Sequence, residues 1–186
     1  MTSRFRRRLL GTALVLPLLP RIARSQPKPL TPSCGAQTPR QTEGPFFTPS
    51  SPERSTLLEK QSPKEKRFVL AGTVLSPDCK PVSGAVVDFW HCDEKGRYDN
   101  EGFTYRGHQR TDTQGRYRLE TIVPGVYPGR TRHFHVKVQA PGSRVLTTQL
   151  YFPGEPVNAR DGIYRPELEI ALAQPGQGSF DFVVAA

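Results

Sequence analysis

The chain has 186 residues and a formal net charge of +9. This length is typical of one domain with one hydrophobic core. Residues 1–25 contain six arginines and no acidic residue, so residues 26–186 carry a net charge of only +3. Because no basic stripe with interleaved aromatic residues remains there, we expect no nucleic-acid partner.

Residues 1–25 have the pattern of an export signal that is removed on maturation. A basic start precedes an apolar run at residues 9–19, and residues 23–25 (Ala-Arg-Ser) resemble a cleavage site. The run is too short to span a membrane, which takes about twenty apolar residues. The arginines at positions 6–8 resemble the twin-arginine signal of proteins exported already folded; an ordinary secretory signal with extra arginines is the alternative. We predict a periplasmic or extracellular protein with no membrane span after cleavage.

Residues 26–63 are rich in Pro, Ser and Thr. Proline lacks the backbone donor that a helix interior or a central strand needs. We therefore expect an extended N-terminal arm that runs over the body of the domain.

Short blocks that alternate in polarity or run apolar, separated by turns with Gly and Pro, predict β-strands after this arm. No persuasive 3.6-residue apolar stripe appears after residue 25, in agreement with the 19 prolines of the chain. We predict an all-β fold, a single β-sandwich domain over residues 64–186. The expected strands are residues 67–75, 85–93, 116–122, 132–140, 145–152 and 178–186.

The three cysteines, Cys34, Cys79 and Cys92, allow at most one internal disulfide in an oxidising compartment. No Cys-x-x-Cys pair is present, which argues against a zinc or redox site. Cys79 lies in an expected turn and Cys92 at the far end of the following strand, which disfavours a bridge between these two. A disulfide from Cys34 remains open.

The segment VYPGRTRHFHVKV, residues 126–138, concentrates one tyrosine, two arginines and two histidines. On a strand, side chains alternate between faces, so His133 and His135 share one face and Phe134 points to the other. Two imidazoles on one face are suited to chelate one ion, although a solvent-facing pair is the alternative.

Two tyrosines favour a particular ion. Tyr127 follows a tight Pro/Gly turn directly before this strand, and Tyr98 is presented from a loop after an upstream strand. No acidic triad or third histidine has zinc-like spacing. Since a phenol has a pKa of about 10, tyrosine binds well only where the metal takes its proton. Ferric iron does so, and these residues therefore predict Fe(III).

These features together resemble the intradiol ring-cleavage dioxygenases, of which the catechol and protocatechuate enzymes are the best known. Residues 72–155 carry the resemblance through Gly-x-Tyr, Pro-Gly-x-Tyr-Pro, His-x-His and Leu-Thr-Thr-Gln, and QTEGPFF in the arm resembles a substrate-lining segment. The resemblance implies an enzyme that inserts both atoms of O2 into a catechol-type aromatic diol. The ring opens between the two hydroxylated carbons to give a muconate-type diacid.

By matching position, the resemblance implies that Tyr98, Tyr127, His133 and His135 bind one non-haem Fe(III) per chain. It implies that Tyr127 is the ligand that leaves when the diol binds through both oxygens. Arg130 would stabilise negative charge that develops on the ring.

The resemblance also implies that Gln149 contacts the bound ring and that Gly44 and Pro45 line the pocket. Arg132 could face the site in place of Arg130, and Tyr105 competes with Tyr98 but lacks the Gly-x-Tyr context. Three other residues are expected in core packing, behind the ligands or on the surface: Trp90, His91 and His108.

The chain departs from the best-known members at several points. Its segment 127–133 is shorter, and RTRHFH stands where they have Arg-Pro-Ala-His-Ile-His. No long helical segment precedes the sandwich, whereas the catechol-type enzymes use one to dimerise, so a homodimer remains open. Residues that would select the carboxylate of protocatechuate are not located by the sequence.

Two other classes remain as alternatives. The turn motifs also resemble the carboxypeptidase regulatory-type domains, non-catalytic sandwich modules related in shape to transthyretin, which bind or pack. Their Gly, Pro and Asp residues only make turns, and such a module does not call for the tyrosines and His-x-His together. A zinc or copper hydrolase or carrier on the same fold is the third interpretation.

Overall fold

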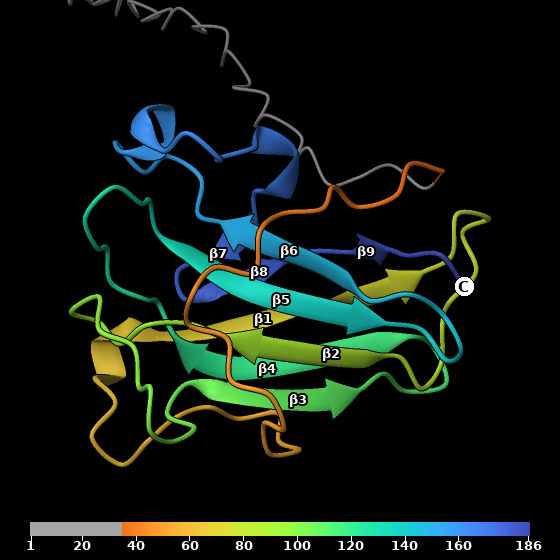
Figure 1. Ribbon diagram of the computed structural model, residues 1–186, viewed down its shortest axis with the longest axis horizontal. Helices are drawn as coiled ribbons and strands as arrows, with labels where there is room; N and C mark the ends of the chain where they lie inside the picture. Colours follow the sequence, from red (N-terminus) through yellow and green to blue (C-terminus); the bar gives the residue numbers. More distant parts are fainter. Residues whose placement is uncertain (1–34) are drawn as a thin grey trace, which may run out of the picture.

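The computed structural model describes residues 35–186, so the predicted export signal, the start of the arm and Cys34 lie outside the described residues. Within the described part, every regular element is a β-strand or a single-turn 3-10 helix. The strands form two sheets that enclose one apolar core (Figure 1). The predicted all-β sandwich is confirmed.

The first sheet contains β1 (Arg67–Leu75), β4 (Arg116–Ile122), β7 (Ala171–Gln174), β8 (Gln177–Ser179) and β9 (Phe182–Val183). Its order is β4-β1-β8-β7, and β9 pairs with the end of β1. β1 and β4 are antiparallel, with Leu70 opposite Leu119. Both side chains are fully buried, so this central pair forms one wall of the core.

The second sheet contains β2 (Val86–Trp90), β3 (Arg106–Arg110), β5 (His133–Gln139) and β6 (Leu146–Tyr151). Its order is β3-β2-β5-β6, with all neighbours antiparallel. The register places His135 opposite Trp90 on one side and opposite Gln149 on the other. Three residues singled out in the sequence therefore lie in one row across this sheet.

The strand β5 is buried on both faces, which decides the surroundings of the histidines. Phe134 belongs to the core and is 0% exposed, as the alternation predicts. His133 and His135 point to the opposite face, yet they are only 2% and 1% exposed. Loops and the arm cover this outer face, so two polar rings are buried outside the sandwich core.

The described part of the arm, residues 35–63, crosses the outer face of the second sheet (Figure 1, orange). Backbone N–H groups of Gln41, Arg54 and Leu57 donate to carbonyl oxygens of β6, β3 and β4, at 2.9, 2.8 and 2.7 Å respectively. Exposed strand edges present unpaired backbone groups, and these hydrogen bonds satisfy part of them. The arm is thus fastened along its length.

Two observed strands were not predicted. β1 has the predicted bounds, and β2, β4, β5 and β6 lie within predicted blocks. The sequence of β3, RGHQR, is polar and contains a glycine, and it becomes a strand because β2 pairs along its whole length. β7 is a short, mostly exposed edge strand. The three 3-10 helices are η1 (Lys64–Lys66), η2 (Asn158–Arg160) and η3 (Pro166–Leu168).

The cysteines are in different states. Cys79 is disulfide-bonded, and Cys92 is a buried free thiol. A bridge between these two is therefore excluded, as the sequence indicated. No helix within residues 35–186 is long and apolar enough to cross a membrane.

One glycine in β1 is required by a close backbone approach. A Cβ at Gly72 would lie 1.8 Å from the carbonyl oxygen of Phe180, which also accepts a hydrogen bond from the Tyr117 hydroxyl at 2.7 Å. We expect Gly72→Ala to lower the free energy of unfolding by about 2 kcal/mol or more, because backbone must move to admit the methyl group. Urea denaturation measures this loss.

Gly162→Ala is the matched control, since a Cβ there meets nothing within 4 Å. Its unfolding free energy should change by no more than about 0.5 kcal/mol. Equal denaturation midpoints for the two variants would contradict the packing of β1 against residue 180.

Candidate metal centre

The structure brings the four predicted metal ligands together. His133 Nε2 lies 3.1 Å from His135 Nε2 and 3.3 Å from the Tyr127 hydroxyl. The Tyr98 ring centre is 5.8 Å from that of Tyr127 and 6.2 Å from that of His135. Two phenols and two imidazoles from β5 and two loops therefore face one small volume.

Two glycines explain why the loops that carry the tyrosines meet. Gly96 and Gly125 each stand two residues before a predicted ligand tyrosine, Tyr98 and Tyr127 respectively. A Cβ on Gly96 would lie 2.3 Å from the Val126 carbonyl oxygen, and one on Gly125 would lie 2.4 Å from the Gly96 nitrogen. The glycines of the two tyrosine motifs thus allow backbone-to-backbone contact between the loops.

Both histidines present uncharged rings. The Nδ1–H of His133 donates to the Thr131 carbonyl oxygen at 2.6 Å, which leaves the Nε2 lone pair toward the cluster. Such a second hydrogen bond is typical of metal-binding histidines. Burial lowers the pKa of His133 to about 4, and burial together with the neighbouring His133 lowers the pKa of His135. Both rings are therefore neutral at neutral pH and free to donate a lone pair.

The tyrosine hydroxyls are held protonated by their surroundings. Burial, and then the nearby Tyr127, raises the pKa of Tyr98 well above 10. Burial also raises the pKa of Tyr127, although the charge of Arg130 opposes this. The buried Tyr98 hydroxyl has no hydrogen-bond partner within residues 35–186, and an unpaired buried hydroxyl is costly.

This donor set fits a hard, highly charged cation. A bound cation would displace the protons of both phenols to solvent and give the unpaired Tyr98 oxygen a partner. Within residues 35–186, no group of three or more His, Cys, Asp or Glu side chains is placed to hold a metal ion; the four donors here are phenols and imidazoles. Tyrosinate oxygens are ligands of oxidised iron, and the residues present fit ferric iron.

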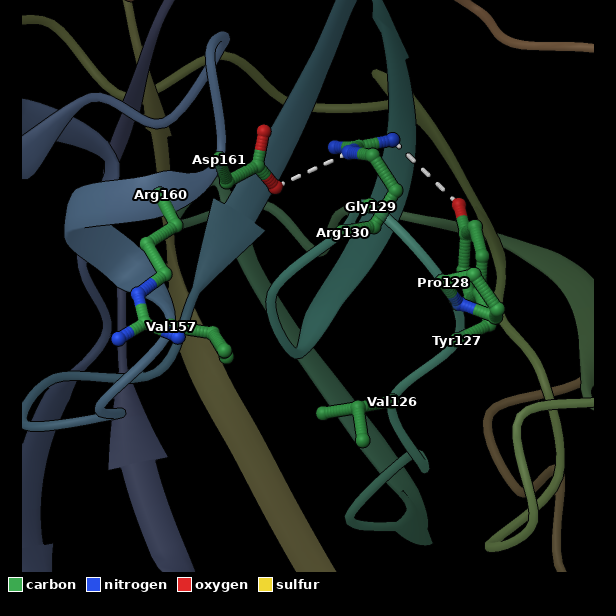
Figure 2. Close-up of a pocket in the computed structure, with 8 residues that line it drawn as sticks. All are labelled: Val126, Tyr127, Pro128, Gly129, Arg130, Val157, Arg160 and Asp161. Atoms are coloured by element: carbon green, nitrogen blue, oxygen red, sulfur yellow. Dashed lines mark hydrogen bonds and ion pairs between the residues drawn. The ribbon is translucent and has the colours of Figure 1, made fainter.

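Arg130 is aimed at the cluster by a buried carboxylate (Figure 2). Its Nε donates to Asp161 at 3.0 Å, its Nη1 lies 3.4 Å from the Tyr127 hydroxyl, and its Nη2 donates to Gln149. Backbone N–H groups of Thr131 and Ile163 also donate to Asp161, at 2.9 and 3.1 Å. They and Arg130 hold the pKa of Asp161 below 3.8 against the opposing effect of burial.

Arg132, the competing arginine, points elsewhere. It donates to Glu155 at 2.9 Å and to the Pro124 carbonyl oxygen. Of the two arginines, only Arg130 contacts a predicted ligand, Tyr127.

Gln149 connects the cluster to the arm. It is 0% exposed, and its Nε2 donates to the Thr42 carbonyl oxygen at 2.9 Å. Gly44, two residues further, has a φ of +72°, and a Cβ there would lie 3.3 Å from His135 Cε1. Pro45 follows and is exposed. Gln149 and Gly44 thus lie beside the predicted ligands, and the substrate roles of these three residues stay predictions.

The other candidates lie away from the four donors or behind them. Tyr105 is stacked on His91 with its ring centre 5.0 Å away, and its hydroxyl contacts Ser62. His91 is buried and bonded to Thr121 and to backbone. Trp90 stacks parallel to His135 at 4.9 Å and supports that ring.

His108 lies on β3, where its Nδ1 is 3.1 Å from the Ser51 hydroxyl. Ser51 also donates to Asp88 at 2.9 Å. This trio fastens the arm to the sheet.

Three contributors to the site were missed in the sequence. Phe46 stacks on Tyr98 with ring centres 4.2 Å apart. Arg106, 1% exposed, donates to the backbone oxygens of Phe46 and Asp99, and its Cζ lies 5.9 Å from the Tyr98 ring. Asp161 orients Arg130. Phe46 follows the recognised Gly-Pro of the arm, which is a usable signal, whereas nothing near Arg106 or Asp161 marks them.

A cavity of about 470 Å³ adjoins the cluster. The turn at residues 126–130 forms one side, and Val157, Arg160 and Asp161 form the other (Figure 2). Tyr127, one of the four predicted ligands, and Arg130, which contacts it, both line the cavity, so a molecule in the cavity has access to the predicted ligand that leaves.

The chain is similar to known dioxygenases. A family model described as Dioxygenase matches residues 42–175. The catechol 1,2-dioxygenase of Acinetobacter baylyi is 31% identical over 155 residues, which are 68% of this chain and 50% of that protein. The protocatechuate 3,4-dioxygenase beta chain of Burkholderia cepacia is 37% identical over 128 residues, 59% of this chain and 54% of that one. The chain spans about half the length of the curated relatives it matches.

A solved structure matches over nearly its full length. The dioxygenase domain of a dioxygenase carbohydrate-binding protein fusion from Streptomyces sp. SirexAA-E is 51% identical, with a TM-score of 0.77. The match covers 81% of this chain and 99% of that one. The sandwich, the sequence motifs and the matched family model together show that the chain belongs to the intradiol ring-cleavage dioxygenase family.

Proposed function

We propose that the protein is a non-haem Fe(III)-dependent intradiol dioxygenase. It inserts both atoms of O2 into a catechol-type diol, cleaving the ring between the two hydroxylated carbons to give a muconate-type diacid. The observation that carries the proposal is the convergence of Tyr98, Tyr127, His133 and His135 on one volume. The names of the relatives, catechol 1,2-dioxygenase and protocatechuate 3,4-dioxygenase, support the reaction class.

These four residues would hold the iron. When bound, ferric iron supplies the Lewis acidity that favours loss of the diol protons and makes the ring reactive toward dioxygen. Two phenolates offset two of the three positive charges of the ion, and the neutral imidazoles add none, so one positive charge remains for an anionic substrate oxygen. The protein supplies everything else: binding, orientation, exclusion of water and proton handling.

Tyr127 handles a proton at its Oη. A Tyr127 phenolate would accept a diol proton there, and Arg130 Nη1, which lies 3.4 Å away, would donate a hydrogen bond to the resulting hydroxyl. Arg130 keeps its charge because Tyr127 and Asp161 raise its pKa against the effect of burial. A fixed guanidinium next to the ring stabilises negative charge that develops there.

Gln149 and the arm position the substrate and keep water out. The Gln149 amide is fixed between Arg130 and the Thr42 carbonyl oxygen, so it cannot turn away from the ring. Gly44 passes close to His135, since a Cβ there would lie 3.3 Å from His135 Cε1. Phe46 covers Tyr98, which leaves the cavity beside Tyr127 as the approach for a diol.

Colour and oxygen uptake test the proposal together. We expect the iron-loaded protein to be red-brown from tyrosinate-to-Fe(III) charge transfer and to consume one O2 per catechol, with a product opened between the hydroxylated carbons. Tyr98→Phe should bleach the visible band because one phenolate is lost. Tyr105→Phe is the matched control, since its hydroxyl contacts Ser62, and should keep the colour. A colourless protein after reconstitution, cleavage outside the diol, or turnover only with Fe(II) would refute the proposal.

The two arginines separate electrostatic catalysis from metal binding. Arg130→Leu should keep the visible band and lower kcat by about 10²–10³-fold, the usual cost of removing one group that stabilises transition-state charge. Arg132→Leu removes the same charge from a neighbouring position that faces Glu155 and should keep kcat within about threefold. The reverse ranking in stopped-flow or steady-state assays would assign the role to Arg132.

We also propose that residues 1–25 direct export by the twin-arginine route, which the arginines at positions 6–8 support. Replacing these three arginines by lysine should retain the protein in the cytoplasm, because the route requires arginine at its recognition pair. Cell fractionation measures the distribution. Replacing Arg4 and Arg21 by lysine is the control and should leave export unchanged; equal export of both variants would point to the ordinary secretory route.

A further inference from the structure

The cavity beside Tyr127 carries an excess of positive charge. Three charged side chains line it: Arg130, Arg160 and Asp161. Arg130 and Asp161 form an ion pair at 3.0 Å, with the carboxylate only 1% exposed. Asp161 also accepts two backbone N–H groups, so its acceptor capacity is used within the fold.

Among the described residues, Arg160 is the one charged residue of the cavity lining whose charge is not balanced by an ion pair. Its side chain makes no hydrogen bond or ion pair within residues 35–186, while its backbone is fixed in η2 by a bond from its N–H to the Val157 carbonyl oxygen at 3.0 Å. Neighbouring acids are engaged elsewhere: Glu155 pairs with Arg132, and Glu169 accepts from Tyr164 at 2.6 Å. Arg160 is exposed, it lines the cavity, and its side chain extends beside Val157 (Figure 2).

The rest of the lining is apolar. Val126 is 46% exposed, one of four large hydrophobic side chains that the described residues leave exposed, and Pro128 and Val157 continue its surface. Sites that take small organic molecules combine such walls with few polar groups that fix orientation. The volume of about 470 Å³ lies within the range of about 300–1,000 Å³ for these sites. A ring that carries a further group fits this space.

We propose that Arg160 is a specificity-determining residue that selects aromatic diols bearing a carboxylate on a short side arm. The diol end lies at Tyr127 and Arg130, the ring lies along Val126 and Val157, and the carboxylate pairs with the Arg160 guanidinium. This assignment rests on the proposed ring-cleavage function and names the substrate class that the site prefers.

Steady-state kinetics test the preference with three diols: catechol, 4-methylcatechol and 3,4-dihydroxyphenylacetate. Wild-type protein should favour the carboxylated diol. In Arg160→Gln, kcat/KM for 3,4-dihydroxyphenylacetate should fall about fivefold, as expected for the loss of one partly exposed charge pair. Most of this fall should come from a higher KM. The two neutral diols should keep their values. Arg160→Glu should lower the value for the carboxylated diol further.

Arg165→Gln is the matched control. Arg165 carries the same charge five positions away, is exposed, and does not line the cavity. It should leave the preference unchanged. An equal loss in Arg165→Gln, or an unchanged preference in Arg160→Gln, would overturn the assignment.

A binding measurement separates this inference from the ring-cleavage proposal. 4-Hydroxyphenylacetate has the carboxylate arm but no diol, and 4-ethylphenol is a neutral compound of similar size. Calorimetric titration should show tighter binding of the anion to the iron-loaded wild type and loss of that advantage in Arg160→Gln. If no diol is cleaved but this advantage holds, the reaction is wrong and the anion site stands. If diols are cleaved but the wild type does not bind 4-hydroxyphenylacetate more tightly than 4-ethylphenol, the anion site is wrong.

Discussion

The contact between two loops through Gly96 and Gly125 is the constraint on which the candidate metal centre depends. A side chain on either residue would collide with backbone of the other loop. Since each glycine precedes a predicted ligand tyrosine by two positions, the contact sets how far apart the two phenols stand. β5 then provides the histidines at a spacing that its alternation fixes. The centre is therefore built from one rigid strand and one glycine-mediated loop contact.

Burial sets the protonation states of the four predicted ligands. The outer face of β5 would be wet in a plain sandwich, and its histidines would titrate near their ordinary pKa of 6.5. With the arm over them they stay neutral, and the phenols stay protonated until a cation displaces their protons. Arg106 fastens Phe46 of the arm and Asp99 of the Tyr98 loop through backbone oxygens alone. The buried guanidinium of Arg106 thus holds the arm in place over the site. Because its partners are backbone oxygens, no carboxylate is added to the four predicted metal donors.

The sequence predicts most of what repeats along a strand and little of what depends on distant segments. A period of two placed Phe134 in the core and His133 on the other face, and the structure agrees. β3 was not predicted, because its polar sequence has no strand-like alternation and it becomes a strand only by pairing with β2. The contact of Asp161 with Arg130 was missed for a related reason. Thirty-one positions separate the two residues, and no local sequence feature marks a carboxylate as the partner of a particular arginine.

The hydrogen bond from Gln149 to the Thr42 carbonyl oxygen joins residues 107 positions apart. Closing a loop of that length costs more entropy than forming the hairpins of either sheet, and contacts between distant positions form slowly. We therefore expect the arm to dock after the strands that it crosses have paired. Because Gly44 of the docked arm lies beside His135, we expect full metal affinity only after docking, so a bound metal ion would mark a chain whose arm is in place.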